Sequence, residues 1–438
     1  MHSLKVYILI IISISIFSCK NEKEKDTNII CGYYDKMSYY QGDKVALYLN
    51  AKKPISNYKL YLYNINNEIV DSVLIDVFPQ EIKDSSFYWK NGFNFKVTGS
   101  YQIPENLESG VYHFENSNDF IVKNKHQKND ILILFPSNTN NAYTKSGGRS
   151  SYTQPKGDTL SFLRPIETQK YSEAFLPWFL NTEYKADYIC DQDLDNYDNL
   201  KGYKLLIIIG HSEYWTRKAR RNFDKFIAEG GNSLILSGNN MWWHVRYSPD
   251  NTQMICFKTT NRIADSLVAD SLITVSFIDT HTLKYPIIPS IGAHFRYGGY
   301  GNRKDNGWDG YKIVSNSPLF KNTNLKIGDI LSLPSAEYDA APLKFINNKP
   351  FIDTTEASFY KIQLLGYDIG VNSKGEEVYG TFIALQKTKT SGKIVNVCST
   401  NWCANEGING KNSKEVRQIT LNAIDILLNN KPLFNDSE

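Results

Sequence analysis

The sequence lacks the short motifs that would assign an enzyme class directly. It contains no H-E-x-x-H pair and no G-x-S-x-G motif, which argues against the common helix-borne zinc site and the serine nucleophile elbow. Gly147-Gly148 and Gly298-Gly299 have neither the spacing of a P-loop nor that of a dinucleotide-binding loop. The formal net charge of only +3 gives no indication of a nucleic-acid partner.

Cysteine is also scarce, with six residues in a chain of 438. Cys19 lies at the end of an N-terminal apolar run. The other five are far apart and odd in number, so they form no disulfide framework. They also lack the second clustered pair of ligands that a structural zinc site needs. The sequence leaves open whether Cys398 and Cys403 pair with each other.

No stretch of the chain is apolar for long enough to span a bilayer, but the first residues have the pattern of an export signal. Lys5 precedes a short apolar run that ends in Ile16-Phe17-Ser18-Cys19 and resembles a bacterial lipobox. We therefore expect a lipoprotein signal peptide over residues 1–19, lipidation of Cys19, and a charged tether over residues 20–28. This predicts an exported protein, lipid-anchored to a bacterial membrane, on the periplasmic side or at the cell surface. The alternative is an ordinary cleaved signal in which Cys19 is incidental.

The rest of the chain changes its pattern near residue 124. Before that point, short runs with period-two alternation are separated by Gly, Asn, Asp and Pro, at residues 45–49, 58–63, 95–97 and 111–114. This pattern predicts an Ig-like β-sandwich over residues 29–124. A polar linker follows, and residues 130–432 are expected to form a second, α/β domain.

The second region begins with strands that are apolar on both faces, as in a parallel sheet covered by helices. Such strands are expected at residues 131–135, 186–190, 204–209 and 233–237, with a helix between the last two that starts at Thr216. Strand, helix and strand joined by short connections predict a doubly wound parallel sheet. Further along we expect long insertions over residues 257–371, a hairpin over 381–398, and a last helix over 413–428 with a capping box from Asn412 and Glu415.

Polar side chains gather where these strands end, which is where sites lie in open α/β sheets. Tyr143 and Tyr152 follow the first strand, His211 and Glu213 follow the third, and Asn239 follows the fourth. Phenolate and carboxylate oxygens are hard donors that suit an oxidised iron ion. Such a metal would polarise an amide carbonyl and lower the pKa of bound water.

The residues by themselves leave a structural explanation open. In a sequence with 29 tyrosines, Tyr143, Tyr152 and Tyr214 can be packing residues. Glu213 can cap the helix that follows it, where a carboxylate is favoured. The turn after the third strand, Gly210-His211-Ser212-Glu213, contains no cysteine, so amidotransferase-like cysteine chemistry is not expected.

Several motifs, in this order, resemble one known family. They include Asn141-Ala142-Tyr143, residues 147–152, 160–165, 211–215 and 238–243. On these motifs the chain is identified as a member of the family of the N,N-dimethylformamidase large (beta) subunit, C-terminal domain. The resemblance implies a glutamine-amidotransferase-like fold for residues 130–432. It implies one mononuclear ferric iron held by Tyr143, Tyr152 and Glu213, and catalytic residues that include the following: His211, Asn239, Lys258 and Glu337.

The same resemblance implies a metal-dependent hydrolase that acts on the C–N bond of a linear amide. The loop between Tyr143 and Tyr152 is much shorter here than in the dimethylformamide enzyme, so the substrate is not expected to carry over. The expected partners are a small amide-like substrate and, through the lipid anchor, the membrane. The alternative function is a non-catalytic lipoprotein that binds glycans or peptides through tryptophans: Trp215, Trp242, Trp243 and Trp308.

Replacing Cys19 with Ala is expected to release the protein from the membrane fraction, because no thiol remains to carry the lipid. Cell fractionation and immunoblotting of the full-length chain check this. Ser18→Ala keeps the thiol, serves as the matched control, and is expected to stay with the membranes. A Cys19→Ala protein that still sediments with membranes would contradict lipidation at this residue.

Overall fold

The computed structural model describes residues 29–81, 87–258, 265, 268–301, 310–372 and 374–434. The expected signal peptide, the tether, Cys19 and Trp308 lie outside these residues. The described part is an α/β structure with mixed sheets, mostly strand with few helices, and none of its helices is both long and apolar enough to cross a bilayer. Its five cysteines, Cys398 and Cys403 among them, are free thiols.

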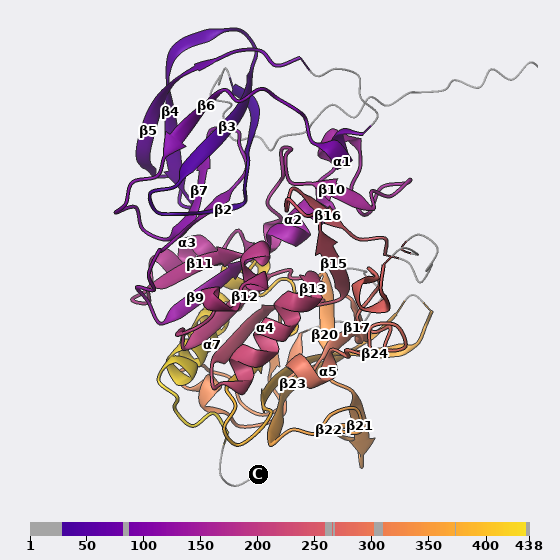
Figure 1. The fold of residues 1–438 in the computed structure, drawn as a ribbon. Coiled ribbons are helices and arrows are strands. Elements are labelled where there is room, and N and C mark those ends of the chain that lie inside the picture. Colours follow the sequence, from indigo (N-terminus) through magenta and orange to yellow (C-terminus); the bar gives the residue numbers. More distant parts are fainter. Residues whose placement is uncertain are drawn as a thin grey trace, which may run out of the picture.

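The N-terminal region contains two β-sheets that share one apolar core (Figure 1). Along the third strand, Val45, Leu47 and Leu49 are fully buried, which confirms the period-two pattern there. The three-stranded sheet consists of β1 (Ile29–Tyr34), β3 (Lys44–Ala51) and β6 (Gly99–Gln102). The five-stranded sheet consists of β2 (Ser38–Tyr40), β8 (Phe120–Lys123), β7 (Gly110–Phe114), β4 (Ile55–Asn64) and β5 (Ile69–Val77).

The strand expected at residues 95–97 is wrong, because the nearest strand begins only at Gly99. Phe95 instead packs against Tyr33, with ring centroids 5.5 Å apart, and its backbone N–H donates to the Tyr33 hydroxyl at 3.0 Å. An aromatic contact, not pairing with another strand, therefore accounts for the apolar residue in this stretch.

A nine-stranded sheet forms the centre of the second region. Its first five strands are parallel, as expected: β11 (Ala186–Cys190), β9 (Ile131–Phe135), β12 (Leu205–Gly210), β14 (Asn232–Ser237) and β25 (Lys393–Asn396). The other four are antiparallel to their neighbours: β24 (Glu377–Gln386), β23 (Lys361–Val371), β18 (Tyr311–Ile313) and β19 (Ile330–Leu331).

The parallel sheet expected from the sequence is therefore one half of a larger, mixed sheet. The hairpin between β24 and β25, which the sequence did predict, reverses the chain direction, and every strand added beyond it pairs antiparallel. Three of these strands come from residues 311–371, which were expected to be insertions and instead extend the sheet.

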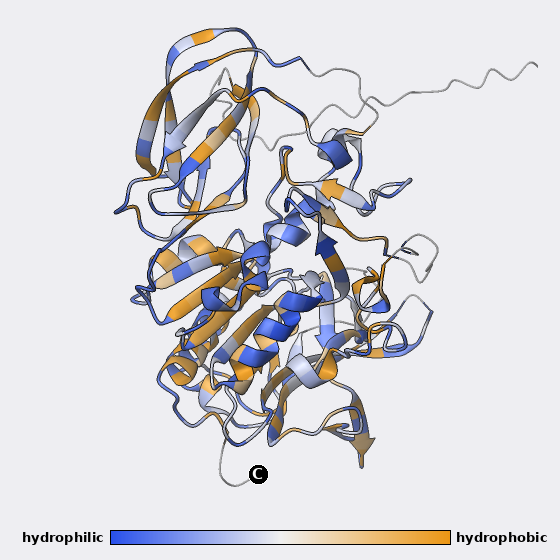
Figure 2. Cartoon of the chain, viewed as in Figure 1, coloured by the Kyte–Doolittle hydropathy of each residue, from blue (hydrophilic) through white to orange (hydrophobic). Residues whose placement is uncertain are grey.

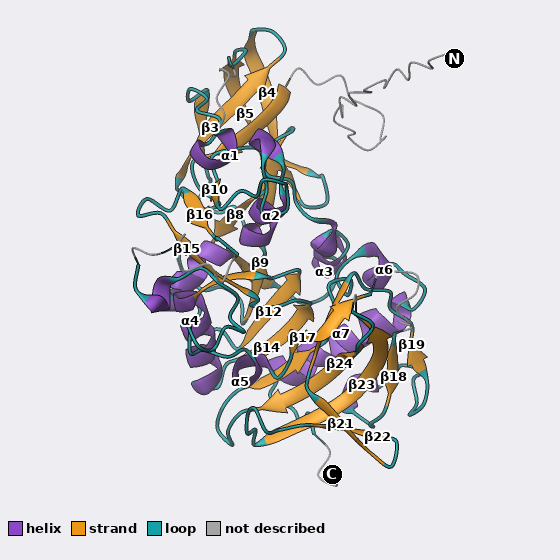
Figure 3. Cartoon of the chain, turned by 90° about the vertical axis from the view of Figure 1, so that its right-hand side faces the viewer, coloured by secondary structure: helices purple, strands orange, loops and turns teal. Residues whose placement is uncertain are grey.

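Helices cover both faces of the parallel strands (Figure 3). Ile131 and Ile133 of β9 pack in the same core as α7 (Ser413–Leu428), whereas Leu132 and Leu134 pack with α4 (Arg217–Ala228). Figure 2 shows the result as hydrophobic strands beneath helices with hydrophilic outer faces. This alternation explains why these strands read as continuous apolar runs.

The two main helices differ in how they begin. Thr216 caps α4 as expected, because its hydroxyl accepts the Ala219 N–H at 2.9 Å. The capping box expected at Asn412 and Glu415 is wrong, since Asn412 makes no side-chain cap and donates instead to the Ser332 carbonyl at 2.8 Å.

The remaining elements are short. A four-stranded sheet contains β10 (Thr159–Ser161), β16 (Gln253–Ile255), β15 (Trp243–Tyr247) and β13 (Tyr214–Thr216). The strand pairs are β17 (His294–Tyr300) with β20 (Glu337–Ala340), and β21 (Leu343–Ile346) with β22 (Lys349–Ile352). The short α-helices are α1 (Tyr88–Asn91), α2 (Ser137–Tyr143), α3 (Phe175–Leu180), α5 (Ile288–Ile291) and α6 (Asn405–Ile408).

The N-terminal sheets pack directly on the second region. Met37, Trp89 and Ile121 belong to the same apolar core as β9. Lys123, at the end of β8, forms an ion pair with Asp193, and both residues are buried at 9% and 8% exposure. The contact between the two regions thus combines an apolar core with a buried ion pair.

Replacing Lys123 with Met is expected to lower the free energy of unfolding by about 3–5 kcal/mol, because it leaves a buried carboxylate without its cation. Urea denaturation of the soluble chain measures this. Lys125→Met removes the exposed pair with Glu105 and is the control, with an expected cost below about 1 kcal/mol. Equal losses of unfolding free energy in the two variants would show that the buried Lys123–Asp193 pair contributes no more to stability than the exposed pair does.

Candidate metal and active site

The carboxyl ends of the parallel strands deliver the expected site residues to one place. Tyr143 is the last residue of α2, which follows β9, and His211 comes directly after β12. Asn239 lies just beyond β14, and Glu337 opens β20. This edge is where an open α/β sheet leaves room for a ligand, because the chain passes there from strand to loop.

Two phenol side chains meet at the buried carboxylate of Glu213. The Tyr143 hydroxyl donates to Oε2 at 3.2 Å, and the Tyr152 hydroxyl lies 2.8 Å from Oε2 and 3.0 Å from Oε1. The two phenol rings are stacked at an angle, with centroids 4.3 Å apart. Oxygen ligands about 2.0–2.2 Å from one cation would be about 3 Å from each other, so the donor set has the right spacing to share an ion.

The tyrosines and Glu213 make specific polar contacts with one another. Tyr152 is 44% exposed as a residue, yet its hydroxyl points inward to Glu213. Glu213 is only 3% exposed and bonds the phenols, whereas the following helix is capped by Thr216. Within the described residues, no group of three or more His, Cys, Asp and Glu side chains could hold a metal ion.

Burial raises the pKa of both Tyr143 and Tyr152 well above that of a free phenol, and the negative charge of Glu213 raises it further. Both phenols therefore carry their protons and donate them to the carboxylate when no cation is present. A cation at this point would replace two protons.

His211 is held in one orientation by its contacts. Its Nδ1 lies 3.0 Å from the carbonyl oxygen of Gly238, which can only accept, so Nδ1 carries a proton. Nε2 lies 3.0 Å from the Tyr143 hydroxyl and 3.5 Å from Oε2 of Glu213. Oε2 of Glu337 is 3.8 Å from the same nitrogen.

Asn239 connects the two carboxylates of the site. Its Nδ2 donates to Oε2 of Glu337 at 2.7 Å and lies 3.4 Å from Oε1 of Glu213. Its backbone has a φ of 48°, a left-handed conformation that asparagine tolerates better than most residues. Burial, and then the charge of Glu213, raise the pKa of Glu337, although His211 opposes this.

Lys258 approaches the same group from the opposite side. Its Nζ lies 3.4 Å from the ring centroid of Tyr152 and 5.1 Å from that of Trp243. Burial lowers the pKa of this ammonium group. All seven residues expected from the sequence are thus neighbours in the structure.

Comparison with known proteins identifies a family for this chain. The model of the family described as "N,N-dimethylformamidase beta subunit-like, C-terminal" matches residues 78–410, which is more than half of the chain. The chain belongs to this family. No curated protein matches. Among solved structures, the mmIFT52 N-terminal domain aligns over 70% of this chain and 99% of its own length, at 10% identity and a TM-score of 0.34, a likeness too weak to support any conclusion.

In this dimethylformamidase-like chain, three contacts of the site were not expected from the sequence. The Tyr214 hydroxyl donates to that of Tyr152 at 2.8 Å, and Thr139 accepts the backbone N–H of Glu213 at 3.1 Å. The ring of Tyr171 meets the His211 ring edge-on, with centroids 5.4 Å apart. The sequence places Tyr214 next to Glu213. The sequence positions of Thr139 and Tyr171, in contrast, give no indication that these residues reach the site.

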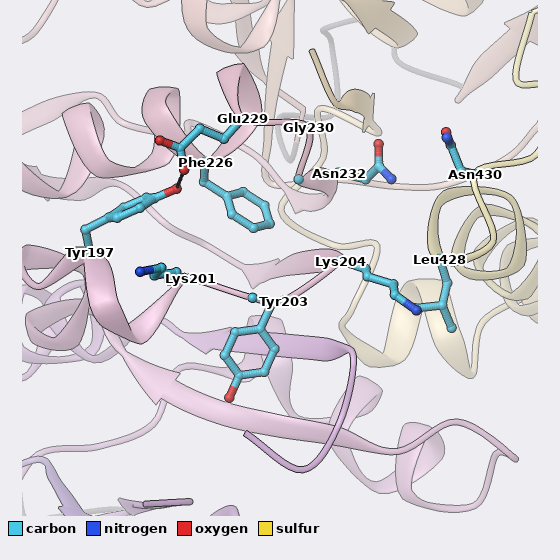
Figure 4. A pocket seen from close by; sticks show the side chains of 12 residues that line it. Tyr197, Lys201, Tyr203, Lys204, Phe226, Glu229, Gly230, Asn232, Leu428 and Asn430 are labelled. Carbon is cyan, nitrogen blue, oxygen red and sulfur yellow. Dashed lines mark hydrogen bonds between the residues drawn. The ribbon is translucent and has the colours of Figure 1, made fainter. Parts of the chain in front are cut away.

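The tryptophans proposed for ligand binding are only partly available. Trp215 is buried and donates its Nε1 to the Ser212 carbonyl at 3.0 Å, so its expected role at a binding surface is wrong. Trp242 and Trp243 are half-buried. A separate pocket of about 330 Å³ lies at the amino ends of β12 and β14, where Tyr197 and Glu229 are hydrogen-bonded (Figure 4), and none of the seven site residues lines it.

Asp339 fixes the turn that carries Asn239. This residue on β20 is fully buried, and its Oδ2 accepts both the backbone N–H and the Nδ2 of Asn240, at 3.0 and 2.9 Å. Burial raises the pKa of Asp339 to about 7. The folded protein therefore binds this proton more tightly than the unfolded chain does.

The contribution of Asp339 to stability should be complete below the ordinary pKa of 3.8 and lost as the pH rises through about 7. Between those values, the free energy of unfolding should fall with rising pH more steeply in the wild type than in Asp339→Asn. The slopes should differ by up to about 1.4 kcal/mol per pH unit. Denaturation across this pH range measures both slopes. Asp198→Asn, at an exposed carboxyl, should keep the wild-type slope, and equal slopes for all three proteins would contradict the assignment.

Proposed function

We propose that the protein is an exported, lipid-anchored, iron-dependent hydrolase that cleaves the C–N bond of a small amide-type substrate. The observation that carries this proposal is the meeting of the Tyr143 and Tyr152 hydroxyls at the buried Glu213 carboxylate. These oxygens form a compact set of hard donors. Family membership supports the hydrolase class, and the lipid anchor rests on the sequence alone.

Tyr143, Tyr152 and Glu213 would hold a single ferric ion. When bound, that ion supplies Lewis-acid polarisation of the scissile carbonyl and a more acidic water. A positive charge at this position also outweighs the burial and the carboxylate charge that keep both phenols protonated, so they would bind as phenolates.

Glu337 is the proposed proton carrier. The water oxygen forms a bond to the amide carbon, and the proton that it releases goes to the Glu337 carboxylate. Glu337 then gives that proton to the nitrogen as the C–N bond breaks, which leaves a carboxylic acid and an amine. The raised pKa of Glu337 makes its carboxylate a stronger proton acceptor than a free glutamate, which suits a group that takes up a proton from water.

The other residues would orient the substrate and stabilise charge. His211 contacts the Tyr143 hydroxyl through Nε2 and the Gly238 carbonyl through Nδ1, so it would hold Tyr143 in position. Oxyanion stabilisation falls to the Asn239 amide and the Lys258 ammonium. Oδ1 of Asn239 is buried and has no hydrogen-bond partner in the described part of the chain, which makes it available to a substrate N–H.

We also assign residues 29–124 as an Ig-like sandwich and residues 130–432 as a glutamine-amidotransferase-like domain. The two sheets with a shared core support the first assignment, and five parallel strands between helices support the second. The family match begins at residue 78, inside the first of these regions, so the functional unit extends across the linker.

A binding protein without catalysis is the second candidate. It is favoured by the half-buried Trp243, whose ring lies beside Lys258 at the rim of the site. Such a protein would hold a glycan or peptide against these side chains and leave its amide bonds intact.

Purified wild-type protein is expected to contain one iron per chain and to show a visible phenolate-to-iron charge-transfer band. Glu213→Ala should lose the metal, and Tyr143→Phe should weaken or abolish the band, because each removes a ligand. Elemental analysis and absorption spectroscopy check this. Tyr188→Phe, at another buried tyrosine, is the control and should keep both signals.

A colourless wild-type protein that binds no stoichiometric metal would overturn the iron site. Product analysis with a panel of linear amides separates the two candidate functions. Release of amine by the iron-loaded protein supports the hydrolase, whereas saccharide or peptide binding that depends on Trp243, with no amine release, supports the binding protein.

A further inference from the structure

Arg164 is one of the largest fully buried side chains, and it lies just after β10 on the segment that leads away from the site. Its guanidinium donates to a set of oxygens that belong almost entirely to the main chain. The acceptors are the Ser161 carbonyl (3.0 Å), Thr144 carbonyl (3.3 Å), Arg149 carbonyl (3.1 Å), Ser146 carbonyl, Asn141 carbonyl (2.9 Å) and Asn141 Oδ1 (2.9 Å).

These acceptors share one feature. Apart from Ser161, all of them lie between Asn141 and Arg149. That stretch contains Tyr143 and ends three residues before Tyr152, so a single side chain is bonded along the loop that separates the two phenols. The planar fork of a guanidinium fixes the relative positions of the carbonyls that it binds.

Burial of the Arg164 charge lowers the stability of the fold. This indicates that the residue serves to hold the loop in position. Burial of the charge lowers the pKa of Arg164 to about 9. A buried charge without a carboxylate partner is tolerated only where dipoles replace its hydration, and here the loop carbonyls do so. If the loop moved, these carbonyls would leave the guanidinium, so the loop conformation and the buried charge stabilise each other.

We infer that Arg164 is the positioning residue that holds Tyr143 and Tyr152 at the distance from Glu213 at which all three can share a cation. The metal role rests on the proposed function. The positioning role does not, because it concerns hydrogen bonds that exist in the protein without a cation.

The N-terminal region holds Arg164 in turn. Asn118, between β7 and β8, donates its Nδ2 to the Arg164 carbonyl at 3.0 Å and accepts the Ile166 N–H at 2.6 Å. Trp89 stacks under Arg149, 4.2 Å from its guanidinium carbon. The first region of the chain thereby supports the loop that carries the phenols.

Arg220 provides a matched control. It is the other fully buried arginine among the largest such side chains, and it also donates to main-chain carbonyls, those of Tyr285 and Pro286 at 2.9 Å each. Burial lowers the pKa of Arg220 in the same way, to about 10. It also donates to the Ser290 hydroxyl at 2.8 Å, so its acceptors belong to α5 and the segment before it, and not to the loop of the phenols.

The test compares Arg164→Met, Arg164→Lys and Arg220→Met in the otherwise intact soluble chain. Amide hydrogen exchange in metal-free protein reports on the loop, where the N–H of Ser151 is bonded to the Ala142 carbonyl and that of Gly148 to the Lys145 carbonyl. Iron titration, followed by the charge-transfer band, reports on the ligands. Urea denaturation reports on stability.

Arg164→Met should speed exchange at these loop amides and weaken iron binding by about 10–100-fold, the usual effect of losing a group that orients a ligand. Arg164→Lys keeps the charge and three donors, so it should recover part of the affinity. Arg220→Met should lose comparable stability and keep both the loop protection and the iron affinity of the wild type.

Wild-type loop exchange in Arg164→Met would overturn the inference, as would an equal loss of iron binding in both Met variants. If Arg164→Met does not fold, Asn141→Ala decides, because it removes one acceptor of Arg164, together with the 3.3 Å bond to the Leu160 carbonyl, and should show the same changes at smaller size. If the wild type binds no iron, the proposed function fails. The exchange measurement in metal-free protein then still decides whether Arg164 positions the loop.

Discussion

The carboxylate of Glu213 has been taken out of water, and the structure around it is arranged to meet that cost. A buried carboxylate needs hydrogen-bond donors, and here they come from Tyr143, Tyr152 and Asn239, which lie on three separate segments. Each donor is itself fixed by further contacts, such as the Tyr214 hydroxyl on Tyr152. The same convergence that satisfies a lone carboxylate also gathers oxygen atoms closely enough to surround a cation.

The residues that hold the side chains around Glu213 in place come from several distant parts of the chain. The Gly238 carbonyl orients His211, Asp339 fixes the turn beyond β14, and Arg164 spans the loop between the phenols. None of these groups donates to the carboxylate itself. The positions of the site residues therefore depend on buried polar contacts. Loss of one such contact would keep the fold but shift the donors relative to the Glu213 carboxylate.

The parts of this structure that the sequence could predict are those encoded locally. Periodicity located β9, β12, β14 and the cap at Thr216, and the rule that sites follow strand ends brought His211 and Glu213 together. The resemblance to a family was needed for Lys258 and Glu337, which come from distant segments. Thr139 and Tyr171 reach the site only through tertiary packing. The antiparallel strands beyond the predicted β24–β25 hairpin depend on strand pairing that no local pattern records.

The apolar core that joins Met37 and Trp89 to β9 has a consequence for how such a chain can diversify. Recombination at the polar linker would separate two apolar surfaces that cover each other. The N-terminal β-sheets therefore cannot be exchanged as an independent unit. Sequence change in the N-terminal region is freest on the faces turned away from that junction, for example along β5, where Ile69 and Leu74 are already exposed. New surface properties can therefore arise far from the chemistry while the inner face is inherited together with it.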